Sequence, residues 1–203
     1  TFAITNRTDR GGVRVSYNNI RNTGILPNTD LKRDGIAVSV DQKLTNRLQF
    51  DGFLNYVNSR SDNRPNLGYG YENPIYGFNW TGRQANIESM KDYWQEGQEG
   101  LQHFDINYLW LTNPYFTMFE NTNSFNKNRV FGNASVNYQF SDKLSLRVRS
   151  GVDNYNDNRA FRRAVSTNRN AFGSYREDRI GYYELNNEVL LSYNDNDSKE
   201  IQY

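Results

Sequence analysis

The sequence predicts an all-β protein whose strands form an antiparallel up-and-down sheet, arranged as in a transmembrane β-barrel. Apolar and polar residues alternate along several runs, as they do in strands with one apolar face. Tight-turn signatures interrupt this alternation at residues 43–48 and 139–144, where Thr-Asn and Ser-Asp supply turn chemistry. The other connections are long and polar. Short turns on one edge of a sheet and long loops on the other are typical of outer-membrane barrels.

Alternation predicts about seven strands. In the run 34–43, Ile36, Val38 and Val40 share one face, and the residues between them share the other. The same pattern recurs along the chain and begins once more near its end. The runs are 2–4, 13–18, 34–43, 48–56, 130–140, 144–153 and 183–193, followed by the short run 200–203.

The length of the runs and the residues at their ends favour a membrane barrel over a soluble sandwich. Alternation alone fits both, because a sandwich also has one apolar and one polar face. The runs are roughly 10 residues long, which matches the 9–11 residues that cross a bilayer at a tilt. Aromatic residues gather near strand ends, as interfacial girdles require. They are Tyr17, Phe50, Tyr56, Tyr138, Phe140, Tyr155 and Tyr193.

The connections between the runs differ in length according to the edge of the sheet. Those at 8–12, 45–47, 141–143 and 194–199 are short and are expected on the periplasmic side; those at 22–33, 61–127 and 156–175 are long and are expected outside the cell. Within 61–127, the spacing of Ile87, Met90 and Trp94 predicts a short helix over 84–94. Residues 1–203 are therefore expected to be part of a single transmembrane β-barrel domain, with 61–127 as its long extracellular loop.

Composition restricts the class of protein further. Only 36% of the 203 residues are hydrophobic, yet the chain has 15 Tyr, 12 Phe and 3 Trp, which argues against disorder. The formal net charge of +1 gives no support for nucleic-acid binding. No apolar run is long enough for a membrane-spanning helix, and the sequence has neither an initiator Met nor a signal-peptide pattern. Together with the short run 200–203, this predicts that the chain is a piece of a longer one.

No motif supports catalysis, and none calls for a cofactor. Cysteine is absent, and the single histidine, His103, has no catalytic motif around it. The stretch 68–70 lacks the remaining glycine of a dinucleotide-binding fingerprint. Residues 153–157 and 194–197 resemble calcium loops in composition but lack the spacing of an EF-hand, so ordinary turn chemistry is the expected role and no metal site is predicted.

Two groups of side chains are candidates for ligand binding. The first is the set of charged residues on the faces opposite the apolar rows, which are expected to face the lumen of the barrel: Asp41, Asp51, Arg147, Arg149 and Asp153. These could line a substrate path, or could simply be the polar neighbours that a wet or plugged lumen needs. The second is the aromatic set of the long loop, Trp80, Tyr93, Trp94 and Trp110. Such rings stack on sugars and anchor protein partners, but they could equally form a small core of the loop itself.

The order of several short segments resembles SusC/RagA-type TonB-dependent outer-membrane transporters. The resemblance runs from about Arg14 to Tyr155 and rests on the segments 15–17, 24–33, 44–48, 55–56, 91–94, 113–115, 120–121 and 129–133. It implies a barrel of about 22 strands with a plugged lumen in the bacterial outer membrane. It also implies a SusD-like surface lipoprotein that closes over the barrel, energy from the TonB complex, and oligosaccharides or peptides as cargo. The sequence itself contains no signal peptide, TonB box or plug, and only part of the strands.

The sequence is also compatible with other functions. A siderophore or vitamin receptor belongs to the same class of TonB-dependent importer. Eight strands can also close by themselves, as in a small structural or adhesive barrel. A secreted sugar-binding sandwich is a third alternative, and it would need no detergent for purification.

Overall fold

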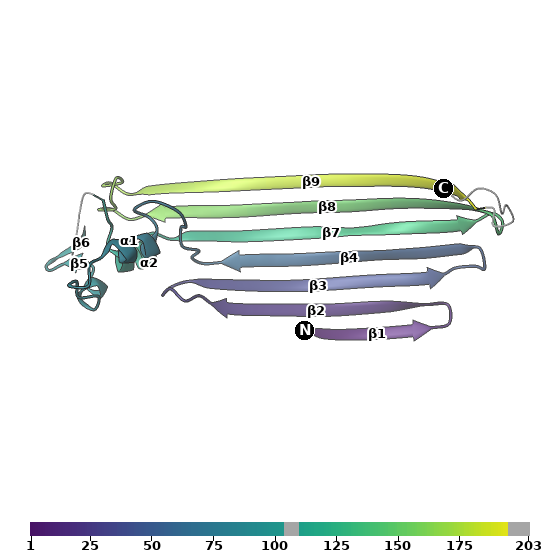
Figure 1. Ribbon diagram of the computed structural model, residues 1–203, viewed down its shortest axis with the longest axis horizontal. Helices are drawn as coiled ribbons and strands as arrows, with labels where there is room; N and C mark the ends of the chain where they lie inside the picture. Colours follow the sequence, from purple (N-terminus) through teal and green to yellow (C-terminus); the bar gives the residue numbers. More distant parts are fainter. Residues whose placement is uncertain (104–109, 195–203) are drawn as a thin grey trace.

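The computed structural model describes residues 1–103 and 110–194, and its main feature is a seven-stranded antiparallel sheet (Figure 1). Each strand pairs with its neighbour in the sheet order β1-β2-β3-β4-β7-β8-β9, so the chain runs up and down as predicted. β1 and β9 lie at opposite edges of an open sheet. The bounds are β1 (Phe2–Thr8), β2 (Gly11–Thr23), β3 (Asp30–Lys43), β4 (Leu48–Ser61), β7 (Asn123–Gln139), β8 (Leu144–Arg163) and β9 (Ser174–Tyr193).

Two hairpins close through the turn chemistry that the sequence indicated. Between β3 and β4, the Thr45 hydroxyl oxygen accepts hydrogen bonds from the backbone N–H of Arg47 at 3.1 Å and of Leu48 at 3.0 Å. Between β7 and β8, the Ser141 hydroxyl oxygen accepts from the Leu144 N–H at 3.2 Å. These side chains fix the pairing register of their hairpins. The predicted turn 194–199 lies outside the described residues except for its first position, and the run 200–203 lies wholly outside them.

The strands extend further toward the long loops than alternation predicted. The connection expected at 22–33 is reduced to residues 24–29, the one at 61–127 to 62–122, and the one at 156–175 to 164–173. The expectation of a turn at 153–157 is wrong, because these residues lie inside the 20-residue strand β8. Successive side chains of a strand point to opposite faces, so the oxygens of this segment do not surround one cation. The backbone pairing of β7, β8 and β9 continues through these polar residues, beyond the point where the apolar pattern stops.

The long connections fold into small elements at one end of the sheet (Figure 1). We call the described residues of 62–122 together with 164–173 the cap. The predicted helix over 84–94 is wrong: only one 3-10 turn, η1 (Ser89–Lys91), forms there. The helices lie elsewhere, because Asn73 and Asn113 cap segments that begin with proline. The remaining cap elements are α1 (Pro74–Trp80), β5 (Trp94–Gln95), β6 (Gln98–Gln102) and α2 (Pro114–Glu120).

The fully buried apolar side chains of the described chain lie in the cap and not under the sheet. They are Pro74, Met90, Phe116 and Met118, and Leu111 is nearly as buried. Among the described helices, none has the length and hydropathy needed to cross a membrane. The sheet therefore presents both of its broad faces to the surroundings, and the chemistry of these faces decides what they contact.

Candidate functional site

One face of the sheet, which we call the apolar face, consists of Val, Leu, Ile, Ala and aromatic side chains on all seven strands. No other described helix or strand makes extensive contact with it. Its side chains are correspondingly open to the surroundings: Leu185 is 50% exposed and Val189 is 71% exposed. The strand register aligns these residues into one continuous surface. They include Ile4, Val15, Ile36, Val38, Val40, Leu54, Ala134, Val136, Val148, Val152, Leu185 and Val189.

Aromatic residues border the apolar face at two levels. Toward the cap, Tyr17, Tyr56 and Tyr183 lie on one row of the register, and toward the tight turns lie Tyr138, Phe140 and Tyr193. Val130 belongs to the first row and Tyr138 to the second, eight positions apart on β7. At about 3.4 Å per residue this separates the rows by about 27 Å along the strand. In a strand tilted by about 40° from the membrane normal, the two rows would lie roughly 21 Å apart along that normal, close to the height of the apolar band of an outer-membrane barrel.

Beyond the row nearer the cap, the same face becomes polar. The Tyr17 hydroxyl donates to Asp34 at 2.7 Å, and Arg21 binds both oxygens of the Asp34 carboxylate at 2.9 and 3.0 Å. The Asn58 amide donates to Asn126 at 2.7 Å. The change from aliphatic to hydrogen-bonded polar side chains therefore coincides with the aromatic row, as at a boundary between lipid and water.

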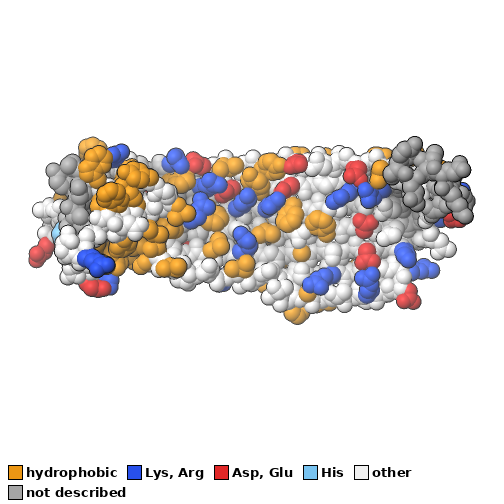
Figure 2. Space-filling view, in the orientation of Figure 1, with side chains coloured by type: hydrophobic (Ala, Val, Ile, Leu, Met, Phe, Trp, Pro, Cys, Tyr) orange, Lys and Arg blue, Asp and Glu red, His pale blue; other side chains and the backbone are white. Residues whose placement is uncertain are grey.

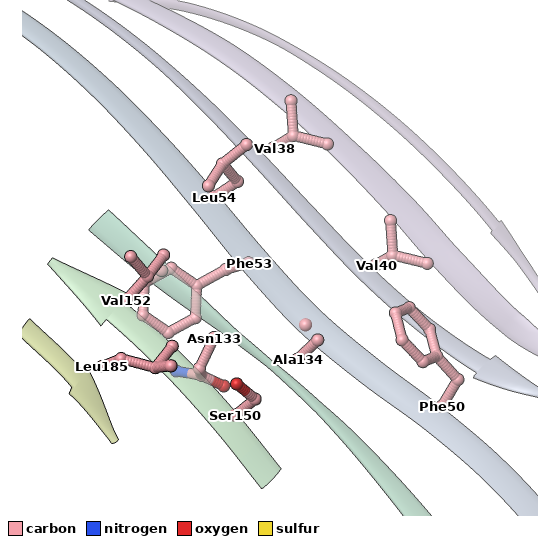
Figure 3. A pocket seen from close by; sticks show the side chains of 12 residues that line it. Val38, Val40, Phe50, Phe53, Leu54, Asn133, Ala134, Ser150, Val152 and Leu185 are labelled. Carbon is pink, nitrogen blue, oxygen red and sulfur yellow. The ribbon is translucent and has the colours of Figure 1, made fainter. Parts of the chain in front are cut away.

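Small residues leave a shallow hollow of about 450 Å³ in the middle of the apolar face. Gly52, Gly132, Ala134 and Ser150 form its floor, and larger apolar side chains stand around it (Figure 3). A Cβ on Gly132 would lie 2.1 Å from the Phe53 carbonyl oxygen, so close strand packing requires glycine there. Strand packing therefore accounts for part of this hollow.

The opposite face, which we call the polar face, contains all five charged residues predicted to line a lumen. Asp41, Asp51 and Arg149 lie on one row of the register. On the same face, Arg147 lies one row away, and Asp153 lies two rows away in the other direction. Asp41 and Asp51 are direct cross-strand partners, and such like charges repel. Ser135 and Asn137 relieve this by donating to the Asp51 carboxylate at 2.7 and 3.0 Å.

Ion pairs cross the strands of the polar face. Arg147 donates to Glu188 at 3.0 Å, and Arg129 makes a two-point contact with Asp153, with one N–H···O distance of 2.8 Å. Charged side chains of both signs are spread along the strands on the side of the molecule seen in Figure 2. The face thus offers a hydrogen-bonding surface with charges of both signs.

The predicted aromatic set divides into two exposed and two packed side chains. Trp80 at the end of α1 is 64% exposed and Trp110 is 63% exposed. Tyr93 and Trp94 instead pack in the small core of the cap: the Trp94 ring lies 5.5 Å from that of Phe116, edge to face. Trp80 and Trp110 are therefore the members of this set that a ligand or partner could contact directly.

Tyr93 is held in the cap by burial and by one carboxylate. Its hydroxyl donates to Glu120 at 2.8 Å. Burial, with the Glu120 carboxylate adding to it, raises the pKa of Tyr93 to about 12. The side chain is therefore a neutral hydrogen-bond donor at physiological pH, which fits a structural role.

Buried polar contacts connect the two loops of the cap. The Gln102 backbone N–H donates to the Ser166 hydroxyl at 3.0 Å, and the Thr167 hydroxyl donates to the Asn121 side-chain oxygen at 2.9 Å. Arg163, whose side chain is buried, makes a two-point ion pair with Glu72 at 2.6 and 2.8 Å. These contacts join segments far apart in the sequence, so the cap is one packed unit.

Sequence reasoning missed several polar-face residues around Gly151 on β8. They are Asn133, together with Tyr182, Glu184 and Asn186 on β9. The prediction of Tyr155 as a girdle residue is wrong, because it lies on the polar face opposite Tyr182. A glycine in the middle of an alternating run was the available signal. Within the described ranges, no group of three or more His, Cys, Asp or Glu side chains is arranged to hold a metal ion.

Comparison with models of known protein families gives no match, and comparison with curated proteins gives none either.

Proposed function

We propose that this chain forms part of the wall of a β-barrel in the bacterial outer membrane, and that the barrel imports oligosaccharides or peptides. The observation that supports this best is the uncovered apolar face between its two aromatic rows. Removing one large aliphatic side chain from water contributes about 1.5–3 kcal/mol, so a face of this size needs a cover. Lipid provides that cover without a second sheet, and the aromatic rows lie where headgroups would begin.

The polar face and the cap support the transport part of the proposal. In a closed barrel the polar face would line the lumen, and paired charges of both signs would give a passing ligand hydrogen-bonding partners. The cap would lie outside the cell, with Trp80 and Trp110 available for contact. By resemblance to SusC/RagA-type transporters, a SusD-like lipoprotein would close over the cap. The TonB complex would then act on a plug supplied by residues outside this sequence.

Sidedness can be tested with spin labels, because the chain contains no cysteine that would interfere. Val148→Cys and Arg149→Cys place labels on adjacent residues of β8 that belong to opposite faces. In outer-membrane vesicles the label at 148 should respond to oxygen dissolved in lipid, and the label at 149 to a water-soluble nickel complex. If both labels respond only to the nickel complex, or if the protein is soluble without detergent, the barrel proposal is wrong.

Transport is tested by uptake in cells. Labelled oligosaccharides and peptides should enter cells that express the full-length protein, and uptake should stop when the TonB complex or the lid lipoprotein is deleted. Uptake of a ferric siderophore or cobalamin instead would assign the other class of TonB-dependent receptor. If none of these compounds enters the cell in a TonB-dependent way, the import proposal fails and a structural or adhesive barrel takes its place.

A further inference from the structure

The polar face contains a hollow of about 540 Å³ centred on Gly151. The register of β7, β8 and β9 places Gly151 opposite Asn133 on one side and Asn186 on the other. On the same face, Arg149 and Asp153 are the next residues of β8 in either direction, and Glu188 and Glu184 are their partners on β9. Gly151 is therefore the centre of a block of polar side chains, and the missing side chain produces the hollow.

The backbone does not require glycine at this position. A Cβ on Gly151 would lie 3.6 Å from the Asn133 Cβ and from the Gly132 carbonyl oxygen, which is ordinary van der Waals contact. Glycine in the interior of a strand destabilises it by about 0.5–1 kcal/mol relative to alanine. What glycine provides here is open space, and such glycines often mark a site of close approach by a ligand.

Two of the four charged side chains that line the hollow, Asp153 and Glu188, form ion pairs with arginines outside it. Asp153 binds Arg129 at 2.8 Å, and Glu188 binds Arg147 at 3.0 Å. Glu184 accepts a hydrogen bond from Asn186 at 2.7 Å and another from the Tyr182 hydroxyl. Such carboxylates attract a charged ligand weakly but keep lone pairs that can accept hydroxyl protons. Arg149 has no ion pair within residues 1–103 and 110–194, so its guanidinium can donate to a ligand, although Glu188 is its cross-strand partner.

An aromatic pair lies on the same face nearer the cap, one row beyond Asp153 and Glu184. Tyr155 and Tyr182 are cross-strand partners with stacked rings, their centroids 5.1 Å apart. Across the hollow, β7 and β9 are separated by about 10 Å, since neighbouring strands lie about 4.8 Å apart. That width admits one pyranose ring, with hydroxyls toward the carboxylates and amides.

We propose that the hollow over Gly151 binds one ring of a neutral oligosaccharide. The inference rests on the proposed function, because the polar face must line a water-filled path for a sugar to reach it. It also goes further, because it selects sugars over peptides. The side chains that line the hollow are amides and charged groups, whereas a peptide would also need apolar pockets for its side chains.

The test fills the hollow by a substitution at Gly151 and makes the same substitution at a matched glycine on the opposite face. Gly151→Val places methyl groups in the hollow, and valine suits a strand. Gly181→Val is the control: Gly181 lies in the interior of β9, where a Cβ would lie 3.7 Å from the Asn156 side chain, on the other face. Binding of maltotriose, cellotriose, mannotriose and trialanine to the full-length protein in detergent is measured by calorimetry.

We expect saturable binding of at least one trisaccharide, an affinity at least 10-fold lower in Gly151→Val, and a change of less than twofold in Gly181→Val. The inference is overturned if no trisaccharide binds saturably, or if the two variants lose affinity equally. It is also overturned if trialanine is the probe whose binding depends on Gly151. Because binding in detergent needs neither the TonB complex nor uptake, these outcomes are separate from failure of the import proposal.

Discussion

Asn113 is the residue whose removal should loosen the cap most clearly. Its side-chain oxygen accepts from the backbone N–H of Tyr115 at 2.9 Å and of Phe116 at 3.4 Å, which caps α2. Its amide donates to the carbonyl oxygens of Met90 at 3.0 Å and His103 at 3.2 Å. The residue is buried, so Asn113→Ala removes a cap and two donors at a site that water does not reach.

The expected loss follows from these contacts. Replacing an N-cap asparagine by alanine costs about 1 kcal/mol. Each of the two carbonyls that loses its donor adds about 1 kcal/mol in a buried setting. A total of about 3 kcal/mol corresponds to roughly a 100-fold change in the opening equilibrium of the cap. The sheet should not open, because its strands pair with one another and not with α2.

Hydrogen exchange followed by mass spectrometry measures the opening of the cap and the protection of the sheet in one experiment. Amides of α2 should exchange roughly 100-fold faster in Asn113→Ala, while amides of β7 and β8 keep their protection. Asn73→Ala is the matched control, because Asn73 caps α1 in the same way, with an Ile75 N–H distance of 3.0 Å, but at an exposed site. Its effect should be about 1 kcal/mol, or roughly fivefold, and local to α1. Equal effects of the two variants, or loss of protection in β7 and β8, would refute the reasoning.

Three further predictions concern the cap. Because the pKa of Tyr93 is raised from 10 to about 12, the fold favours its neutral phenol. This stabilisation should be complete below pH 10 and lost as the pH rises through about 12. The difference in phenolate absorbance between wild type and Tyr93→Phe should titrate near 12, and a midpoint near 10 would contradict the burial argument. Trp80→Ala should weaken ligand capture or lid association without changing hydrogen exchange in the sheet, and unchanged binding of both ligand and lid would exclude this tryptophan from the contact surface. Arg163→Met leaves the partly buried Glu72 carboxylate without its two-point partner and should destabilise the cap by about 1–3 kcal/mol. Limited proteolysis should then cut within 62–73 faster than in wild type, whereas the double variant Arg163→Met with Glu72→Leu should recover part of the resistance.

Local chemistry in the sequence predicts most of the sheet. Alternation assigns Ile36, Val38 and Val40 to one face, and the cross-strand register confirms it. The turn residues Thr45 and Ser141 make the hydrogen bonds expected of them. Both signals are short in range, since a strand has a period of two residues and a hairpin closes within a few positions.

The helices show where local patterns mislead. The spacing of Ile87, Met90 and Trp94 matches a helix, but these residues lie in a single 3-10 turn and its flanking segments. The stronger signal was Asn followed by Pro at 73–74 and 113–114, which combines an N-cap with a preset first helical residue. Packing around Phe116 then determines which apolar side chains are buried.

By itself the sequence determined which residues share a face of each strand, where the tight hairpins close and that the chain is built mainly of β-strands, because these features depend on neighbours only a few positions away. The tertiary structure alone decided the length of β8 and β9, the packing of Tyr93 and Trp94, and the hollow over Gly151. These depend on segments distant along the chain, such as Gln102 with Ser166, and on three strands aligned side by side. No local sequence pattern predicts such contacts, because their favourable free energy is gained only when the segments meet.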